Sequence, residues 1–312
     1  MKCYLCGSEE LKIVREKVRY NIPRKVLECQ NCGLNYLKPT SEDLEDYYAA
    51  DYRKNYKPIL GEPLKCKEMF ELLLPYQMAR VEEIKHLLHP EIKILDVGCS
   101  TGHFLYTIKE YVKECVGIEY NQKDADFTQN ELGIKTYSTS IEKTGLPLAY
   151  YDMITLYQVL EHFEDPIKSL KIYKKYLRDD GYLVVEVPNI QDILISGYKI
   201  DNYLDFWFRE PHLFNFSPKT LTMVMEKAGF KGNIKGFQCY NLMNHFNWIF
   251  LKKPQKSIEM GWSEPILIKD EGLDSQIKKE INIWFTNVNK EYQKLLEKHL
   301  ISESILFIGQ KE

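Results

Sequence analysis

Two pairs of cysteines near the N-terminus offer the clearest metal-binding chemistry in the chain. Cys3 and Cys6 form one C-x-x-C pair, and Cys29 and Cys32 form another. Each pair can turn two thiolates toward one point, and four thiolates suit a closed tetrahedral zinc site without an open coordination position. The spacing therefore predicts a structural zinc ion and argues against a catalytic one. Free or redox-active thiols are the alternative.

A glycine-containing loop is the second feature whose residue types could do chemistry. An apolar strand is expected over 92–97, and it leads through Asp96, Gly98 and Gly102 into a helix. A loop at a helix N-terminus can offer backbone N–H groups to a ligand. The spacing differs from the dinucleotide pattern G-x-G-x-x-G, because other residues stand where its second and third glycines belong. A nicotinamide-dependent dehydrogenase is therefore disfavoured.

The loop resembles the D-x-G-x-x-x-G loop of class I S-adenosylmethionine (SAM)-dependent methyltransferases, with Ser100 where the commonest form has glycine. The resemblance covers about 92–190 and includes two later motifs, at 140–142 and 157–166. It implies that the loop holds the methionine part of SAM and that Glu119 binds the ribose hydroxyls. The residues that the resemblance assigns to SAM are Asp96, Gly98, Cys99, Ser100, Gly102, Glu119, Tyr120, Ser140, Ile141, Gln158 and Leu160.

A segment rich in aromatic residues, 207–216, carries the candidate catalytic residues His212 and Glu210. It resembles the segment H-L-x-x-F-S-P-x-T-L, which is common in methyltransferases of polysaccharide and glycan gene clusters. Methyl transfer to a hydroxyl also requires a base that removes the proton. We take His212 as the candidate base or substrate contact. A structural histidine bonded to a backbone carbonyl, and an ion pair between Glu210 and Arg209, are the alternatives.

Strands and helices must position these residues, and the sequence shows alternating patterns of both. Strands are expected over 92–97, 115–120, 134–137, 151–157, 182–187, 230–240 and 305–308. Helices are expected over 41–48, 66–88 (divided near Pro75), 104–111, 124–132, 166–177 and 218–229. Such alternation is typical of a parallel sheet with helices on both faces. The predicted fold class is α/β, with the Rossmann-like seven-stranded sheet of class I methyltransferases.

The pattern divides the chain into three parts. We expect a zinc-ribbon-like β-hairpin element at 1–40, a helical linker or cap at 41–90, and a methyltransferase domain at 91–312. Insertions at 190–216 and 241–302 follow strands that would end at the ligand-binding edge of the sheet. They are therefore expected to form a helical lid over the substrate.

Composition limits the classes of partner. The chain has 312 residues, of which 44% are hydrophobic, enough for one large core and a small satellite. With 42 basic and 45 acidic residues, its formal net charge of −3 gives no electrostatic footprint of nucleic-acid binding. It has neither a continuous apolar run long enough for a transmembrane helix nor an apolar N-terminal signal segment. We expect a cytoplasmic protein with reduced cysteines, a small-molecule substrate and no nucleic-acid partner.

These observations predict a SAM-dependent methyltransferase acting on a hydroxyl of a sugar, a nucleotide-sugar or a related polysaccharide or natural-product precursor. Sugar C- or N-methylation is an alternative. Similar sugar C-methyltransferases also carry an N-terminal cysteine element but typically add a C-terminal domain, whereas this chain ends soon after its last expected strand. A nucleic-acid-binding or RNA-modifying protein that uses the zinc ribbon as its reader is the alternative from another class. It is disfavoured because Val187-Pro188-Asn189 replaces the N-P-P-Y or S-P-P-Y motif of amino-methylating enzymes.

Overall fold

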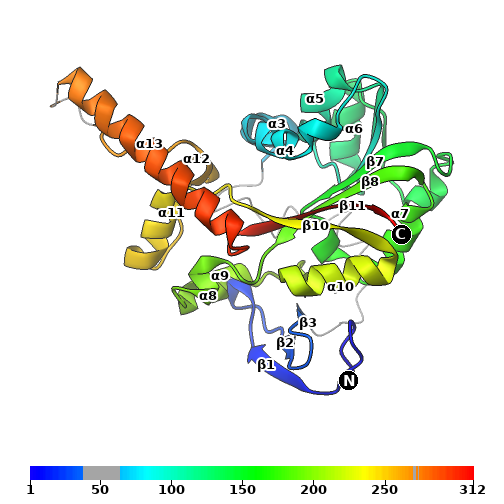
Figure 1. Ribbon diagram of the computed structural model, residues 1–312, viewed down its shortest axis with the longest axis horizontal. Coiled ribbons are helices and arrows are strands. Elements are labelled where there is room, and N and C mark those ends of the chain that lie inside the picture. The colour runs from blue at the N-terminus through cyan, green and yellow to red at the C-terminus, as the bar shows by residue number, and fades with distance from the viewer. Residues whose placement is uncertain (38–63, 270–271, 273) are drawn as a thin grey trace. The chain divides into compact units, whose positions relative to one another are not determined.

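A seven-stranded sheet forms the centre of one part of the protein (Figure 1), whose computed structural model describes residues 1–37, 64–269, 272 and 274–312. Its strands are β4 (Lys93–Val97), β5 (Glu114–Ile118), β6 (Thr136–Tyr137), β7 (Tyr151–Tyr157), β8 (Leu177–Pro188), β10 (Phe230–Phe237) and β11 (Ser304–Lys311). Their order is β10-β11-β8-β7-β4-β5-β6, and the neighbours from β8 to β6 run parallel. The Rossmann-like α/β fold predicted from the sequence is confirmed.

Helices lie on both faces of this sheet. They are α3 (Cys66–Leu73), α4 (Gln77–Ile84), α5 (His103–Ile108), α6 (Gln122–Asn130), α7 (Pro166–Lys174) and α10 (Pro218–Ala228). Figure 1 shows α3 to α6 on one side and α7 and α10 on the other. Pro75 lies in a 3-10 turn between α3 and α4, as its missing N–H favours. The helix expected over 41–48 lies outside the described residues.

The two central strands are apolar because helices cover both faces of the sheet. Leu95 of β4 and Ile154 of β7 are fully buried and lie opposite each other in the parallel register. The next pair in that register is Asp96 opposite Thr155, which are polar and equally buried. The polar pair therefore marks the point where the apolar strands reach the loop that contains Gly98.

A second sheet carries the cysteine pairs. Its strands β1 (Leu11–Arg15), β2 (Val26–Cys29), β3 (Asn35–Leu37) and β9 (Phe214–Asn215) are ordered β1-β2-β3-β9, and all neighbours are antiparallel. The predicted hairpin between the cysteine pairs is confirmed. The sequence did not predict β9, a strand of two residues from the first insertion that pairs with β3.

The chain divides into two compact units, which we call the hairpin unit and the sheet unit. The hairpin unit comprises Met1–Lys38, Pro188–Pro218 and Lys235–Leu306, and the sheet unit comprises Pro39–Val187, Lys219–Ile234 and Phe307–Glu312. Both predicted insertions thus fold in the same unit as the cysteine pairs. Their helices are α8 (Ile193–Ser196), α9 (Asp201–Trp207), α11 (Leu242–Phe246) with a π-helix (Asn247–Leu251), α12 (Ile258–Trp262) and α13 (Ser275–Lys298).

Hydrophobic packing holds the two insertions together. Leu194 and Tyr203 of the first insertion form one buried cluster with Trp248 of the second. The ring centroids of Tyr203 and Trp248 lie 4.8 Å apart in an edge-to-face arrangement. None of the helices in the described part of the chain has the length and hydropathy needed to span a membrane.

Candidate functional site

The glycine-containing loop makes a tight turn between β4 and α5. Gly98 and Gly102 adopt left-handed φ angles of 73° and 71°, which glycine reaches without strain. Ser100, between them, also has a positive φ of 51°, an unusual conformation for a residue with a side chain. The Gly98 N–H donates to the carbonyl of Ile118 at the end of β5, 2.7 Å away. The loop is thereby fixed to the carboxyl edge of the parallel sheet.

Side chains on neighbouring elements leave no room for a Cβ atom at either glycine. A Cβ on Gly98 would stand 2.4 Å from a Val159 methyl carbon, and one on Gly102 would stand 2.5 Å from a Thr128 methyl carbon. Val159 belongs to the segment after β7 that the sequence assigns to the same ligand. The shape of the loop therefore depends on close packing as well as on backbone freedom.

Glu119, directly after β5, faces this loop. One carboxylate oxygen accepts from the backbone N–H of Ser100 at 2.9 Å, and the other accepts from that of Asn121 at 2.8 Å. Asn121 in turn caps α6, because its side chain accepts from two N–H groups of the first turn. Glu119 and the loop, which the sequence predicted to act together, are thus joined by a hydrogen bond.

Asp96 is a buried carboxyl group at the end of β4. Its Oδ1 accepts a hydrogen bond of 2.6 Å from the Thr155 hydroxyl on β7. Burial raises the pKa of Asp96 to about 7, while the Thr155 hydrogen bond and the Arg80 charge lower it and the Glu119 charge raises it. The group is therefore poised to change its ionisation near neutral pH.

Cys99 has a packing role in the loop. Its sulfur fills the space beside Gly117 of β5, where a Cβ would stand 2.6 Å from it. Burial raises the pKa of the Cys99 thiol well above its usual value, so the thiol is neutral at physiological pH. A neutral buried thiol is a poor nucleophile.

The segment after β7 is held by a buried ion pair. The Gln158 side-chain amide donates to Glu186 Oε1 at 2.7 Å, and the Gln158 backbone has a positive φ of 60°. Arg80 of α4 donates to both oxygens of Glu186, at 2.8 and 3.1 Å. A bidentate pair of this kind fixes both partners geometrically. Gln158 is therefore positioned by two residues that the sequence analysis did not identify.

The remaining residues assigned to SAM differ in exposure. Leu160 and Ile141 are buried, whereas Ser140 and Tyr120 are half-buried. Ser140 directly precedes a short 3-10 turn, Ile141–Lys143. All of these residues belong to the sheet unit, as do Asp96 and the glycine loop.

His212 and Glu210 belong to the hairpin unit. His212 is buried, and its backbone N–H donates to the carbonyl of Arg209 at 3.1 Å. It stands two residues before β9, so strand pairing with β3 fixes the adjacent backbone. Glu210 forms an ion pair of 3.7 Å with Arg24, in place of the pair with Arg209 that the sequence suggested.

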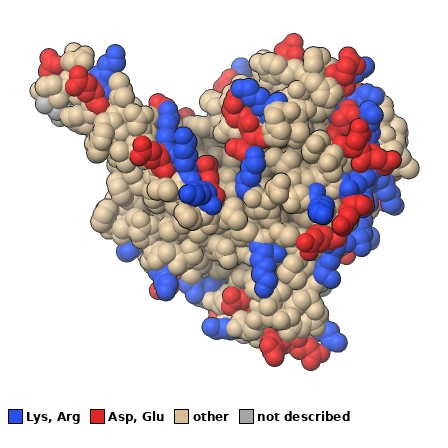
Figure 2. Space-filling model, viewed as in Figure 1, with Lys and Arg blue, Asp and Glu red and all other residues tan. Residues whose placement is uncertain are grey.

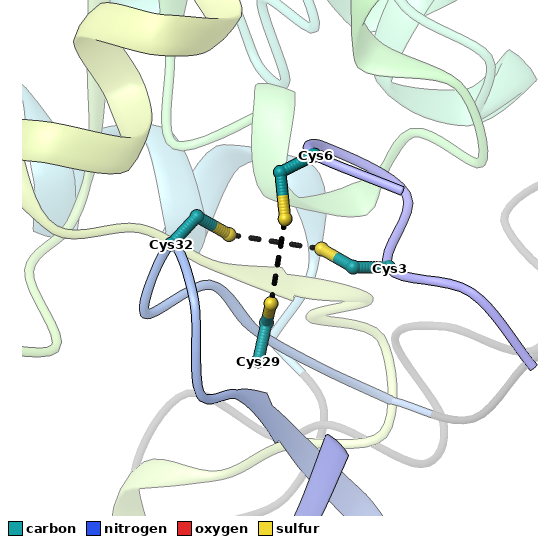
Figure 3. A group of neighbouring side chains, drawn as sticks. All are labelled: Cys3, Cys6, Cys29 and Cys32. Atoms are coloured by element: carbon teal, nitrogen blue, oxygen red, sulfur yellow. Dashed lines mark hydrogen bonds between the residues drawn. The ribbon is translucent and has the colours of Figure 1, made fainter. Parts of the chain in front are cut away.

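The four N-terminal cysteines form a cluster with the geometry of a metal site. Their sulfurs point toward one centre (Figure 3), with 3.6 Å between those of Cys3 and Cys32 and 3.5 Å between those of Cys6 and Cys29. Four Zn–S bonds of about 2.3 Å in a tetrahedron place the sulfurs roughly 3.8 Å apart. The side-chain amide of Asn31 also points at the Cys6 sulfur, 3.5 Å away. The donor set and its spacing fit a Zn²⁺ ion, or another ion that prefers thiolates.

Three of the residues that sequence reasoning missed share a property: each acts through a partner far away in the chain. Thr155, Glu186 and Arg80 are polar residues within strands or helices. Those strands and helices are predicted from their apolar residues alone, so the polar ones drew no attention. Glu186 could have been recognised, because a charged residue inside an otherwise apolar strand needs a partner. Asn121 was recognisable in principle as a helix cap.

Charged side chains of both signs are interspersed on the face of the protein shown in Figure 2. Lys and Arg do not gather there into an extended field. This arrangement agrees with the near-neutral composition of the chain.

Comparison with known proteins places these features in a family. A family model described as a methyltransferase domain matches residues 68–234, which is more than half of the chain. A tRNA U34 carboxymethyltransferase of Aeromonas hydrophila is 28% identical over 150 residues, covering 44% of this chain and 44% of its own. A ubiquinone biosynthesis O-methyltransferase of Actinobacillus pleuropneumoniae is 25% identical over 169 residues, covering 50% of this chain and 67% of its own.

The fold has a counterpart among solved structures. A chain of the complex between the Haloferax volcanii Trm112 methyltransferase activator and a methyltransferase aligns with a TM-score of 0.50 and 10% identity. The alignment covers 87% of this chain and 99% of that one. The chain spans about half the length of the curated relatives it matches.

Proposed function

Because this chain belongs to the methyltransferase-domain family, we propose that it transfers the methyl group of SAM to a small-molecule acceptor. The observation that carries the proposal is the glycine loop between β4 and α5, with Glu119 hydrogen-bonded to it at 2.9 Å. A carboxylate beside bare backbone suits a ligand that has a ribose diol next to a charged amino-acid part. The matched family region contains the entire loop.

Each part of the proposed SAM site has a chemical role. The backbone of Gly98, Cys99, Ser100 and Gly102 would hold the methionine part, and the buried Asp96 would supply a counter-charge. Glu119 would accept hydrogen bonds from the ribose hydroxyls, and Tyr120 follows it in the chain. Ser140 and Ile141 would contact the adenine, and Gln158 and Leu160 would form the wall after β7.

The bound SAM supplies an electrophilic methyl group on a sulfonium. The protein must align the acceptor in line with the carbon–sulfur bond and exclude water, which removes several kcal/mol of barrier. His212 takes the acceptor's hydroxyl proton as the new oxygen–carbon bond forms, and Glu210 holds the segment through its pair with Arg24. The leaving group would be S-adenosylhomocysteine, which would keep the electron pair of the broken carbon–sulfur bond.

The proposed acceptor is a hydroxyl of a sugar, a nucleotide-sugar or a related precursor of polysaccharide or natural-product assembly. The segment around His212 and the mixed surface charge support it. An O-methyltransferase among the relatives agrees with transfer to oxygen. Because one relative modifies tRNA, an RNA acceptor is the second candidate. Methylation of a sugar at carbon or nitrogen is a variation of the first candidate.

We also propose that Cys3, Cys6, Cys29 and Cys32 hold a structural Zn²⁺ ion. All four thiolates would be ligands, which leaves no position for a substrate. The ion would stabilise a hairpin that is too small to form a core alone. Thiolate ligation requires reduced cysteines, which agrees with a cytoplasmic location.

Titration calorimetry with SAM, S-adenosylhomocysteine and NAD tests the cofactor assignment. We expect micromolar binding of the first two ligands and none of the third; NAD binding without SAM binding would refute the proposal. A gain of one methyl mass after incubation with sugars and nucleotide-sugars tests the acceptor. Methylation of bulk RNA in preference to these compounds would select the second candidate.

Replacing His212 by alanine should lower the catalytic rate far more than the affinity for SAM. General-base catalysis typically contributes about 10²- to 10⁴-fold, so a loss of that size in kcat is expected. His299→Ala, at an exposed histidine of the same unit, is the control and should retain the wild-type rate. Unchanged kcat in His212→Ala would show that His212 is structural.

The Asp96 carboxyl should make SAM binding depend on pH. Its pKa of about 7 means that it carries a proton below pH 7 and a negative charge above it. Because the cationic ligand favours the ionised form, we expect SAM to bind about tenfold more weakly at pH 6 than at pH 8. Asp96→Asn, which keeps an acceptor for Thr155, should lose this difference. If SAM affinity changed equally with pH in the wild-type protein and in Asp96→Asn, the pH dependence would belong to the amino group of SAM.

A further inference from the structure

Arg19 is a buried arginine in the hairpin that joins the two cysteine pairs. It lies in a 3-10 turn, Arg19–Asn21, and is only 7% exposed. Its Nε donates to the Phe206 carbonyl at 2.6 Å, and its guanidinium carbon lies 3.4 Å above the centre of the Phe206 ring. The Arg19 backbone N–H also donates to the Phe208 carbonyl at 2.8 Å. The first insertion therefore holds the side chain firmly.

The turn that presents Arg19 is strained. Tyr20 and Asn21 both have left-handed φ angles, 65° and 60°. A left-handed conformation costs a residue with a side chain roughly 1 kcal/mol, and such strain concentrates at functional sites. The turn is also bridged by the strand-like pair Val18 and Ile22. Arg19 is thus followed directly by two residues with an unfavourable backbone conformation.

The charge of Arg19 has no carboxylate partner. Among the residues that the structure describes, no Asp or Glu oxygen lies within ion-pair distance of its guanidinium, and the buried Nη2 has no hydrogen-bond partner. Burial, and then the nearby positive charge of Arg209, lower the pKa of Arg19 to about 9. Buried charges in proteins are normally paired, because an unpaired one costs several kcal/mol. A ligand that brings negative charge would remove this cost.

Two further polar groups interact electrostatically with Arg19, namely the Arg209 guanidinium and the Tyr240 phenol. Arg209 is half-buried and follows directly after Phe208, and no ion pair of its side chain occurs within the described ranges. The charges of Arg209 and Arg19 both favour the ionised form of the Tyr240 phenol, although burial and Glu303 dominate and raise its pKa. Tyr240 therefore lies near both arginines.

The acidic residues nearest in chain and space are engaged elsewhere. Glu303 accepts from the backbone N–H groups of Cys239 and Tyr240 at 2.9 and 3.0 Å, and from the Gln238 side chain at 3.0 Å. Glu210, next to Arg209 in the chain, pairs with Arg24 at 3.7 Å. Neither carboxylate forms an ion pair with Arg19 or Arg209.

We propose that Arg19, Arg209 and Tyr240 bind a phosphate or diphosphate group of the methyl acceptor. Two guanidinium groups and a phenol hydroxyl offer several directed donors and two positive charges, which match a doubly charged phosphoryl group. A neutral sugar hydroxyl would leave both charges uncompensated. In its assignment to the acceptor, this inference rests on the proposed function; it narrows the substrate class to phosphorylated compounds such as nucleoside diphosphate sugars.

The proposal also gives the cysteine hairpin a role in substrate recognition. The hairpin supplies Arg19, the first insertion supplies Arg209 and the second supplies Tyr240. All three donors belong to one compact unit, separate from the unit that contains the glycine loop.

Calorimetric titration of the zinc-loaded 312-residue chain with inorganic pyrophosphate tests the site. We expect the wild-type protein to bind pyrophosphate and inorganic phosphate at low ionic strength. Arg209→Met, at a half-buried position, and Arg19→Met should each weaken pyrophosphate binding at least tenfold. Arg15→Met is the matched control: Arg15 lies on the same hairpin but pairs with Asp201 and Asp205, so affinity should change less than twofold.

Four results would overturn the proposed anion site itself. They are absence of pyrophosphate binding by the wild-type protein, an equal loss in Arg15→Met, tighter binding of succinate than of pyrophosphate, and a parallel loss of SAM affinity in Arg209→Met. The last would reassign the arginine to the carboxylate of SAM. Failure of the wild-type protein to bind SAM would refute the methyltransferase proposal and leave the pyrophosphate result standing. Methylation of free sugars as efficient as that of their nucleoside diphosphate derivatives would refute the assignment to the acceptor.

Discussion

Gly98→Ala is expected to weaken SAM binding at least 100-fold, or by roughly 2.7 kcal/mol. The added Cβ would stand 2.4 Å from Val159, a separation that forces one of the two segments to move. Either movement damages the proposed site, because the glycine loop lies on one side of the contact and Gln158 and Leu160 flank Val159 on the other. Titration calorimetry of the purified variant measures the loss.

Gly133→Ala is the matched control for this substitution. Gly133 has nearly the same left-handed angle, 69° against 73°, but a Cβ there meets nothing within 4 Å. Both variants should lose about 1 kcal/mol of folding free energy from backbone strain. Only Gly98→Ala should lose SAM affinity. Equal affinities in the two variants would show that the loop does not bind SAM.

Cys29→Ser is expected to remove zinc from the protein and to unfold the hairpin. Elemental analysis should find about one zinc ion per chain in the wild-type protein and almost none in the variant, because structural zinc sites need all four ligands. Cys29 ends β2, the strand that pairs with both β1 and β3. Loss of the ion should therefore lower the thermal midpoint of the hairpin unit by many degrees.

Cys66→Ser provides the comparison, since Cys66 is a partly buried cysteine outside the cluster. It should keep a full zinc content and an unchanged melting curve. A wild-type protein that is free of metal yet retains the hairpin after chelation would contradict the proposed zinc site. SAM binding, measured in parallel, should survive in both variants because the glycine loop lies in the sheet unit.

The sheet and its helices were predictable because their signals are local. The expected strand over 92–97 became Lys93–Val97, and that over 151–157 became Tyr151–Tyr157, since each is a continuous apolar run bounded by turns. Pro166 likewise marked the start of α7, and the structure adds the Asp165 side chain as its cap. Such features depend on a few consecutive residues and need no knowledge of the rest of the fold.

Long-range contacts were not predictable in this way. β9 consists of two residues, and its existence depends on Asn35 lying opposite Asn215, far away in the chain. Similarly, nothing near Arg80 in the sequence indicates that it pairs with Glu186. The helical nature of the insertions was expected, but the 24-residue helix α13 and its bounds were not.

Strand β9 has a consequence for how the protein would respond to its surroundings. The Leu37 N–H donates to the carbonyl of Leu213, so the hairpin braced by the cysteines is hydrogen-bonded to the residue after His212. If the proposed zinc ion and the proposed base His212 are correct, a cell short of zinc would contain a protein that still binds SAM but has lost the backbone support beside His212. The catalytic rate would then depend on the zinc supply, whereas the fraction of protein with bound SAM would not.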